Sequence, residues 1–458
     1  MQPSTISALR QIVGDDGVLT RREELLTYGY DATPMMSAMP GCVVFPDSTQ
    51  HVSEILKLAN HERIPVVTRG SGTGLAGGAI PVGDCIVLCT VRMERILKID
   101  TANLTALVET GVLTAKLDEA AQPHGLFYPP DPGSMRISTL GGNVASNAGG
   151  LRGLKYGVTR DYVMALEVVL ANGDVLKTGT ACVKDVAGYN LKDIFIGSEG
   201  TLGVITQILL KLLPRPRAKR TMLATYATMQ DAATTISAII AHPIIPCTLE
   251  FIDRTTIRAV EAYAKIGLPT DIEAVVLMET DGHPTVVEEE ASAMMAIAKK
   301  HNALNVTVAR DAEEAARLAT ARRAAFPALT RTCPTAITED ATVPRDRLVE
   351  MVQFIQQTAQ KHRLQIGIFG HFGDGNLHPT FLCDERNADE VHRVEQAFAE
   401  IFHKAVELGG TITGEHGVGL AKKKFLPAMI GPVSLGVHRK LKQTLDPNGI
   451  LNPGKMFD

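Results

Sequence analysis

A glycine-rich loop in the N-terminal part of the chain limits the folds that the sequence can adopt. IPVVTRG at residues 64–70 has the pattern of a short buried strand, and it runs directly into RGSGTGLAGGAIP at residues 69–81. Only seven residues lead from Gly78 to Cys85, where the apolar stretch CIVLCT begins. Because a helical crossover between parallel strands needs about a dozen residues, the loop is expected to return directly to a strand. The spacing therefore argues against a Rossmann dinucleotide site.

Two more glycine-rich stretches follow, at residues 129–157 and 196–206. The first of them concentrates small and amide-bearing residues, which suit a backbone wrapped around a large extended ligand. Simpler interpretations exist: the loop at 69–81 could be a structural turn, and the stretch at 129–157 a long disordered loop. Three such stretches in one half of the chain favour the ligand-binding interpretation.

Length and composition indicate a soluble globular protein with two domains. The 458 residues exceed one ordinary core, 45% of them are hydrophobic, 21% are charged, and the formal net charge is −4. This charge does not favour a nucleic-acid partner. The sequence shows no secretory signal pattern and no run of about 18 apolar residues, so we expect a cytoplasmic protein, at most peripheral to the inner membrane. The seven cysteines form no CxxC pair for zinc or an iron–sulfur cluster, and we expect them to be reduced and mostly in the core.

A segment that combines prolines with basic residues, LLPRPRAKR at 212–220, marks the expected boundary between the domains. Before it, ALEVVLANGDVL at residues 165–176 is expected to form one strand. After it, strand-like and helix-like stretches alternate, which predicts an α+β cap with an open sheet. These stretches are MLATYAT, QDAATTISAIIA, CTLEFID, TTIRAVEAYAKI, AVVLMETDG and TVVEEEASAMMAIAKKH.

Two histidines flank the strongest hairpin pattern in the sequence. IGIFGHF at residues 366–372 and NLHPTFL at residues 376–382 are predicted strands joined by a two-residue Asp-Gly turn. That register places His371 opposite His378, close enough for both imidazoles to bind one metal ion. The alternative is that both histidines simply pack in a half-buried sheet.

GEHGVG at residues 414–419 supplies a third candidate ligand, Glu415, among glycines that allow a close backbone approach. Two histidines and a carboxylate leave coordination positions open for substrate, as a catalytic metal requires. Adjacent side chains of an extended chain point to opposite sides, so His416 can face a cofactor or substrate when Glu415 faces the metal. We expect His416 to act as a general base, and a solvated loop histidine is the alternative.

The glycine-rich stretches resemble the FAD-binding domain of the vanillyl-alcohol oxidase and p-cresol methylhydroxylase (PCMH) class of flavoproteins. The motifs RGSGTGLAGGAIP, PPDPGS, LGGNVASNAGG and GSEGTLGVIT stand in family order. The resemblance implies an α+β fold: a two-subdomain PCMH-type FAD-binding domain and an α+β substrate cap domain with an antiparallel sheet. It implies non-covalent FAD, since Ser71 stands in a loop where covalent members use histidine or cysteine. The implied FAD-binding residues are Arg69, Gly70, Ser71, Gly72, Thr73, Gly74, Gly77, Pro130, Asp131, Ser134, Gly142, Asn143, Ser146, Gly149, Ile205 and Asn452.

The motifs HFGDGNLHP and GEHGVG, with the ending LKQTLDPNGILNPGKMF, look like the C-terminal domain of FAD-linked oxidases. That domain occurs in D-lactate dehydrogenases, the flavin subunit of glycolate oxidase and D-2-hydroxyglutarate dehydrogenase. The resemblance implies that His371, His378 and Glu415 bind a divalent metal, zinc or manganese, and that His416 is the catalytic base. It also implies that Arg322 binds the substrate carboxylate, where a surface helix arginine is the alternative. The implied domains are an N-terminal helical segment at 1–37, the FAD-binding domain at 38–217 and the C-terminal substrate and metal domain at 218–458.

These expectations describe an enzyme that oxidises a 2-hydroxy acid to the 2-oxo acid, with metal assistance and transfer of hydride to FAD. Members directed to 2-hydroxyglutarate hold its distal carboxylate with a lysine, whereas the corresponding stretch ITEDATVP has Thr338, followed by Glu339 and Asp340. Because two acids would repel a second carboxylate, D-lactate or glycolate is favoured as substrate.

The sequence leaves other functions open. They are a D-2-hydroxyglutarate dehydrogenase, the flavin subunit of a multi-subunit glycolate oxidase complex with an iron–sulfur partner, and a metal-dependent hydrolase without flavin. No nicotinamide site is evident, so the expected electron acceptor is a quinone, a cytochrome or an electron-transfer flavoprotein. The expected assembly is a homodimer.

Overall fold

The computed structural model describes residues 1–457, and the chain forms two compact units. Unit 1 holds residues 1–148, 158–215 and the segment from 415 onward, whereas unit 2 holds residues 149–157 and 216–414. These units are defined by contacts in the structure and not by continuous stretches of sequence. The domain bounds 1–37, 38–217 and 218–458 therefore stay predictions.

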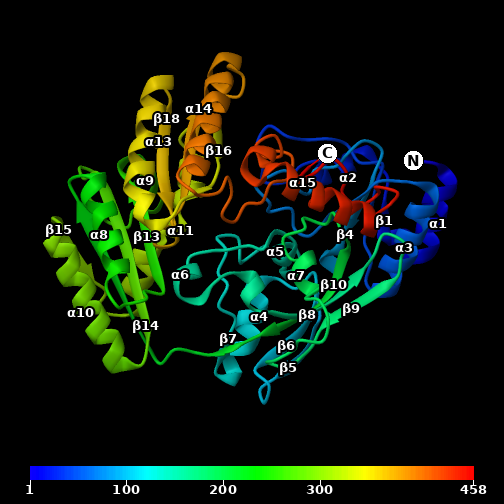
Figure 1. The fold of residues 1–458 in the computed structure, drawn as a ribbon, viewed down its shortest axis with the longest axis horizontal. Coiled ribbons are helices and arrows are strands. Elements are labelled where there is room, and N and C mark those ends of the chain that lie inside the picture. Colours follow the sequence, from blue (N-terminus) through cyan, green and yellow to red (C-terminus); the bar gives the residue numbers. More distant parts are fainter. Residues whose placement is uncertain (458) are drawn as a thin grey trace. The chain divides into compact units, whose positions relative to one another are not determined.

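Unit 1 contains two main sheets (Figure 1). The four-stranded sheet has the order β1-β2-β4-β3, with β2, β4 and β3 parallel, and the five-stranded sheet β5-β6-β10-β8-β9 is antiparallel. A short antiparallel pair joins β11 to β7. The strands are β1 (Val18–Leu19), β2 (Cys42–Val44), β3 (Val66–Arg69), β4 (Ile86–Cys89), β5 (Ile96–Asp100), β6 (Thr105–Glu109), β7 (Leu126–Phe127), β8 (Val163–Val169), β9 (Val175–Gly179), β10 (Val204–Lys211) and β11 (Leu213–Pro214).

The glycine-rich loop behaves as its spacing predicted. Strands β3 and β4 are parallel neighbours, yet residues 70–85 between them contain no helix. The backbone of this loop therefore stays at the end of the sheet, where it is available for contacts other than helical hydrogen bonds.

Helices α1 and α3 cover one face of the four-stranded sheet, and Leu9, Val52 and Ile55 are among their fully buried contacts with it. A separate apolar cluster that includes Val43, Val67 and Val87 fills the opposite face. The helices of unit 1 are α1 (Pro3–Val13), α2 (Arg22–Leu25), α3 (Thr49–Glu62), α4 (Thr114–Ala121), α5 (Leu140–Ser146), α7 (Lys192–Phe195) and α15 (Leu426–Leu445).

Residues 165–176 do not form one strand, contrary to the prediction. The segment belongs to two antiparallel strands, β8 and β9, which are joined by a turn at Asn172-Gly173. Gly173 has φ +84°, and the Leu170 amide donates to the Asp174 carbonyl oxygen over 2.9 Å. Asn-Gly is a strong turn pair, and here it outweighs the continuous apolar pattern.

Unit 2 is built on one eight-stranded sheet in which each described pair is antiparallel. The order is β15-β12-β14-β13-β18-β19-β16, with β17 paired to β19. The strands are β12 (Ala218–Tyr226), β13 (Thr248–Asp253), β14 (Ala274–Gly282), β15 (Ala303–Val308), β16 (Thr335–Thr338), β17 (Ala341–Thr342), β18 (Gln365–Gly370) and β19 (Asn376–Cys383).

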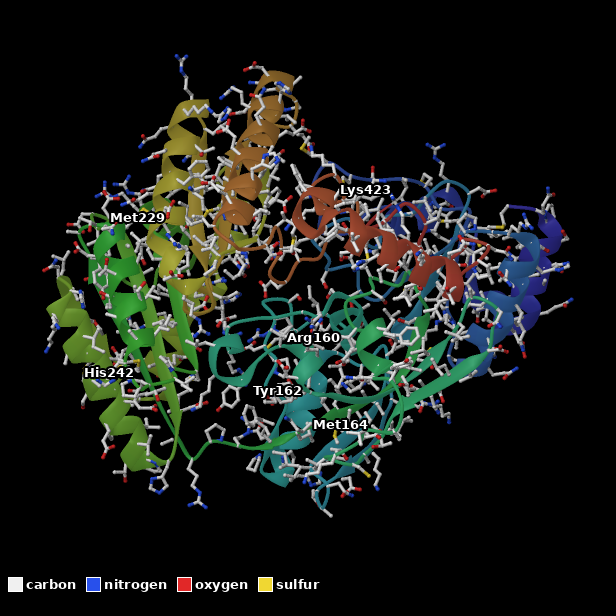
Figure 2. All side chains as sticks on the ribbon, in the orientation of Figure 1. Arg160, Tyr162, Met164, Met229, His242 and Lys423 are labelled. Carbon is white, nitrogen blue, oxygen red and sulfur yellow. The ribbon has the colours of Figure 1, made fainter. Side chains whose placement is uncertain are left out.

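Helices α9, α11 and α12 pack on one face of this sheet, where Leu223, Ile252, Val275 and Phe369 point toward them. Helix α8 follows β12 and begins at its cap Thr228, whose hydroxyl accepts the Asp231 amide over 3.0 Å. Figure 2 labels Met229 and His242, which mark the two ends of this helix. The helices are α6 (Gly153–Tyr156), α8 (Met229–Ala241), α9 (Arg254–Ala264), α10 (Pro284–Lys300), α11 (Ala312–Arg323), α12 (Ala325–Leu329), α13 (Leu348–His362) and α14 (Ala388–Glu407).

The fold class is the predicted α+β class, with an antiparallel sheet in unit 2. Five of the seven cysteines are buried and all seven are free thiols, as expected. Within residues 1–457, no helix is both long and apolar enough to span a bilayer.

Candidate functional site

The histidine hairpin forms, but with a different register from the one predicted. Strand β18 ends at Gly370, and Phe369, not His371, lies opposite His378. Residues 372–374 form a 3-10 turn in place of a two-residue turn. Phe372 is fully buried and stacks on Phe251 with ring centroids 4.2 Å apart. We infer that this packing pulls Phe372 out of the strand pairing and lengthens the turn.

The two histidines nevertheless lie side by side. Their ring centroids are 5.2 Å apart and the ring planes are nearly perpendicular, at 89°. His371 is 5% exposed and His378 is 2% exposed, so water has little access to either ring. The Phe369 ring packs against the His378 ring, with centroids 5.4 Å apart.

A buried carboxylate holds both His371 and Arg322. His371 Nδ1 lies 2.8 Å from Glu250 Oε1, and Arg322 Nε donates to Glu250 Oε2 over 2.6 Å. Alternation along β13 places Glu250 on the same face as Ile252, which is the face covered by α11, the helix that carries Arg322. The Arg322 guanidinium also lies over the Phe369 ring, 4.8 Å from its centroid. Arg322 is thus a buried, paired arginine and not a surface one.

Asp340 fixes the last residues of unit 2. Its Oδ2 accepts the Gly414 amide over 2.6 Å and the Thr413 hydroxyl over 3.3 Å. Just before these residues, Thr411 exchanges two backbone hydrogen bonds with Thr342 of β17, the neighbour of the strand that carries His378. Glu415 is the next residue along the chain, and it begins the third segment of unit 1.

In unit 1, an N-terminal segment braces the glycine-rich loop. Arg69 Nη1 donates to the Tyr30 carbonyl oxygen over 2.6 Å. Asp31 Oδ2 accepts the Ala79 amide over 3.2 Å, and the Thr33 hydroxyl accepts the amide of Gly77 over 2.6 Å. Gly77 has φ +75°, a conformation that favours glycine.

The first and third glycine-rich stretches meet the part of the second that belongs to unit 1, residues 129–148. A Cβ atom placed on Gly70 would lie 2.3 Å from Thr139 Oγ1, so only glycine allows the first stretch to lie so close to the second. The third stretch joins the second at helix α5, because the Glu199 amide donates to the Ala145 carbonyl oxygen over 2.8 Å and the Gly197 amide to that of Val144 over 2.9 Å.

The C-terminal segment closes this arrangement. Asn452 Nδ2 donates to the carbonyl oxygens of Gly78, over 2.9 Å, and Glu199, over 2.7 Å. Lys455 is 2% exposed, and its Nζ donates to the carbonyl oxygens of Gly77, Gly78 and Ile80. Burial lowers the pKa of Lys455 to about 8.

Glu199 anchors the segment that follows His416. Its two carboxylate oxygens accept the amides of Val418 and Gly419, each over 2.7 Å. Burial raises the pKa of Glu199, while these two amides oppose the rise. At Gly419 a Cβ would lie 2.0 Å from the Ala76 carbonyl oxygen, so this segment lies directly against the glycine-rich loop.

The comparisons with known proteins match both halves of the chain. A family model described as the C-terminal domain of FAD linked oxidases matches residues 215–456, more than half of the chain. A second model, an FAD binding domain, matches residues 40–179. The chain belongs to the FAD-linked oxidases.

Relatives cover nearly all of this FAD-linked oxidase. Glycolate oxidase subunit GlcD of Bacillus subtilis (strain 168) is 53% identical over 449 residues, which cover 98% of this chain and 96% of the relative. A D-lactate dehydrogenase of Archaeoglobus fulgidus is 37% identical over 436 residues, covering 94% of this chain and 95% of the relative. The crystal structure of p-cresol methylhydroxylase with substrate bound has a TM-score of 0.82 at 19% identity and covers 99% of this chain and 96% of that one, which shows the PCMH-type fold.

The residues of unit 1 fit the FAD that this family binds. Asn452 Oδ1 is buried and has no hydrogen-bond partner among the described residues. It can therefore accept a hydrogen bond from an N–H or O–H group of a bound molecule. Glu199 and Asn452 also have positive φ, at 51° and 42°, which is unusual for residues other than glycine. Strained conformations of this kind cluster at ligand sites.

The implied FAD-binding residues are distributed as follows in this FAD-linked oxidase. Arg69 ends β3, Ile205 lies buried in β10, and Asn143 in α5 donates to the Thr114 hydroxyl over 2.7 Å. Gly149 is the exception, because it belongs to unit 2 while the others belong to unit 1. The other implied residues of unit 1 are Gly70, Ser71, Gly72, Thr73, Gly74, Gly77, Pro130, Asp131, Ser134, Gly142, Ser146 and Asn452. Their contacts with FAD stay predictions.

Three residues of these networks escaped the sequence interpretation: Glu250, Glu199 and Lys455. Glu199 stands within GSEG, where a carboxylate between glycines could have drawn attention. Glu250 and Lys455 bind partners 72 to 378 positions away in sequence, so no local pattern points to them.

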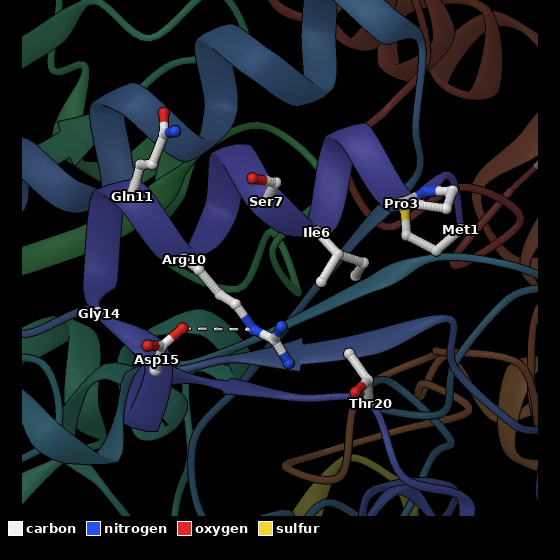
Figure 3. A pocket seen from close by; sticks show the side chains of 9 residues that line it. All are labelled: Met1, Pro3, Ile6, Ser7, Arg10, Gln11, Gly14, Asp15 and Thr20. Carbon is white, nitrogen blue, oxygen red and sulfur yellow. Dashed lines mark ion pairs between the residues drawn. The ribbon is translucent and has the colours of Figure 1, made fainter.

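A surface hollow of about 710 Å³ lies elsewhere, along helix α1 (Figure 3). Its lining includes Arg10 and Asp15, which form an ion pair at 3.7 Å, but none of the predicted site residues. Its exposed lining offers no cluster of groups suited to catalysis.

Proposed function

We propose that this protein oxidises a 2-hydroxy acid to the corresponding 2-oxo acid with FAD as electron acceptor. The observation that carries the proposal is the buried assembly of two histidines, a glutamate and an arginine in unit 2, in a chain that belongs to the FAD-linked oxidases. Relatives named glycolate oxidase subunit and D-lactate dehydrogenase support this substrate class.

Divalent metal is part of the proposal, with His371, His378 and Glu415 as its ligands. The adjacent imidazoles fit such a site, and the Glu250 contact to His371 is the kind of carboxylate support that metal-binding histidines commonly have. Asp340 anchors Gly414, the residue just before Glu415. Because consecutive Cα atoms are about 3.8 Å apart, the backbone of Glu415 lies close to an anchored residue of unit 2. When bound, zinc or manganese would polarise the substrate hydroxyl as a Lewis acid.

The chain's own residues then have separate tasks. Arg322 binds the substrate carboxylate through its terminal nitrogens, because its Nε already donates to Glu250. His416 accepts the hydroxyl proton, and Glu199 positions it by anchoring Val418 and Gly419. The glycine-rich stretches and Asn452 hold FAD, which when bound non-covalently supplies the acceptor for the hydride that leaves the α-carbon.

The substrate we favour is a monocarboxylate, glycolate or D-lactate. Glu339 and Asp340 are buried beside Thr338, where members directed to 2-hydroxyglutarate carry a lysine. Thr338 is a neutral residue whose hydroxyl shares a 2.8 Å hydrogen bond with that of Thr380. It therefore supplies no cation to hold a distal carboxylate. A D-2-hydroxyglutarate dehydrogenase is therefore the less favoured assignment.

A second candidate function is favoured by one finding, the word subunit in the name of the glycolate oxidase relative. In this alternative, the chain is the flavin subunit of a complex and passes electrons to an iron–sulfur partner. In either case we propose that the final acceptor is a quinone, a cytochrome or an electron-transfer flavoprotein, and that the protein works in the cytoplasm or at the inner membrane surface, as a homodimer when alone.

Anaerobic mixing with a panel of 2-hydroxy acids tests the function. We expect glycolate or D-lactate to bleach the flavin absorbance fastest, L-lactate slowly, and D-2-hydroxyglutarate hardly at all. Fastest bleaching by D-2-hydroxyglutarate would overturn the substrate assignment. Copurification with an iron–sulfur protein, together with low activity of the isolated chain, would favour the subunit function.

A further inference from the structure

We propose that Glu250 is a positioning residue that fixes the ring orientation and tautomer of His371 and, at the same time, the guanidinium of Arg322. The inference rests on the proposed function and concerns a residue to which the family resemblance assigned no role. The observation behind it is the pairing of the Glu250 side chain, which is 1% exposed. One carboxylate oxygen lies 2.8 Å from His371 Nδ1, and the other lies 2.6 Å from Arg322 Nε.

The contact to His371 determines which ring nitrogen carries the proton. An ionised carboxylate only accepts hydrogen bonds, so Nδ1 must be the N–H donor. In a neutral imidazole this leaves the lone pair on Nε2, the nitrogen that can bind a metal ion. The opposite tautomer would place the Nδ1 lone pair against a carboxylate oxygen at 2.8 Å, an arrangement that is strongly repulsive in a buried site.

Arg322 supplies the cation that pairs with the buried Glu250 carboxylate. A buried carboxylate without a cation is costly, and the Nε–H of Arg322 supplies both the charge and a directed hydrogen bond. The guanidinium is in turn held over Phe369, at 4.8 Å from the ring centroid. Since Phe369 lies opposite His378 and contacts its ring, the chain of contacts returns to the second histidine.

These contacts form a closed ring, from Glu250 to His371, His378, Phe369, Arg322 and back to Glu250. In a ring of buried groups, no member can turn without losing two contacts. Glu250 is the member that touches both a candidate metal ligand and the candidate substrate arginine. It therefore couples the geometry of the metal site to that of the carboxylate-binding residue.

The first test measures metal affinity of the metal-free, FAD-loaded full-length protein by titration calorimetry, with Zn²⁺ and Mn²⁺ in turn. Glu250→Gln has one acceptor where Glu250 has two, so we expect binding weaker by about 10–100-fold. The matched control is Glu279→Gln in the adjacent strand, because Glu279 is also buried and accepts from Thr221, over 2.7 Å, and Lys219, over 2.7 Å. We expect its affinity to equal that of wild type, and His371→Ala to lose the site.

The outcomes separate this inference from the proposed function. If wild type and His371→Ala bind metal equally, the proposed metal site is wrong. If His371→Ala loses the metal while Glu250→Gln keeps wild-type affinity, the role of Glu250 is overturned and the metal site stands.

A second measurement does not depend on the folding of a Glu250 variant. Nitrogen-15 NMR of histidine-labelled wild type, free of metal, reports the tautomer of His371, whose signals are assigned by their loss in His371→Asn. The inference predicts the Nδ1–H form with an unprotonated Nε2. An Nε2–H form would contradict it.

Discussion

The side-chain amide of Asn452 donates to the carbonyl oxygen of Glu199 over 2.7 Å, although 253 residues separate them in sequence. A second bond to Gly78 over 2.9 Å places the C-terminal segment against two of the three glycine-rich stretches. The amide orientation follows from these two carbonyl acceptors, and it leaves Oδ1 as a buried acceptor.

Replacement of Asn452 should weaken FAD binding. We expect Asn452→Ala to lower the affinity about tenfold, because two anchoring hydrogen bonds and the buried acceptor are lost together. Flavin content after gel filtration and fluorescence titration of the apoprotein measure this. Asn448→Ala is the control, since Asn448 is an exposed residue that bonds to Asn60 over 3.0 Å. Equal affinities for wild type and both variants would contradict the assignment of Asn452.

We expect the contribution of Lys455 to the free energy of unfolding to depend on pH. Burial lowers its pKa to about 8, from an ordinary value of 10.5. Between pH 8 and pH 10.5 the unfolded chain binds this proton and the folded chain does not, so the contribution of Lys455 to folding rises with pH in that window. The difference in urea midpoint between wild type and Lys455→Met should therefore grow from pH 8 to pH 10.5.

At pH 7, Lys455→Met should destabilise the protein by about 3 kcal/mol, because buried carbonyl groups lose a charged donor. The control is Lys423→Met, since Lys423 is only half-buried and donates to a single carbonyl oxygen, that of Gly454, over 3.2 Å; its effect should stay within about 0.5 kcal/mol. A difference in midpoint that does not change with pH would show that Lys455 titrates normally.

Glu199→Gln tests the anchor of the segment that carries His416. A glutamine offers one acceptor where the carboxylate oxygens bind two amides at 2.7 Å, and its NH₂ would face a backbone N–H. We expect faster hydrogen exchange at Val418 and Gly419 and flavin reduction slower by about tenfold. Glu167→Gln is the control, because Glu167 is a buried glutamate of the same unit that accepts from Thr49 and Thr206. Unchanged exchange at both amides would remove Glu199 from this role.

His416→Ala should keep the yellow flavin spectrum and lose reduction by substrate. Loss of a general base costs about 10²–10⁴-fold in rate. His438→Ala is the control, since His438 bonds to the Ser434 carbonyl oxygen within α15 and should not affect the rate. Reduction of His416→Ala at the wild-type rate would mean that another group accepts the proton.

The sequence predicted the glycine-rich loop better than the histidine hairpin, for a physical reason. Seven residues cannot form a helical crossover, so the return of the chain from Gly78 to a strand followed from chain length alone. The hairpin register depended on whether Phe372 would pair in the strand or stack on Phe251, and Phe251 lies 121 positions earlier. Local spacing could not foresee that contact.

The same limit applies to the supporting residues. His371 and His378 are neighbours in sequence and were found as a pair, whereas Glu250 meets them only through the order of strands in the sheet. Lys455 likewise meets the glycine-rich loop only after the chain returns to unit 1.

Metal-assisted oxidation by the flavin is tested most directly by anaerobic single-turnover reduction with glycolate and D-lactate, before and after metal removal. We expect a chelator to abolish bleaching while the flavin stays bound, and added Zn²⁺ or Mn²⁺ to restore bleaching in wild type but not in His371→Ala. Bleaching at the same rate in metal-free protein, or no bleaching by any 2-hydroxy acid with metal present, would show that the proposed function is wrong.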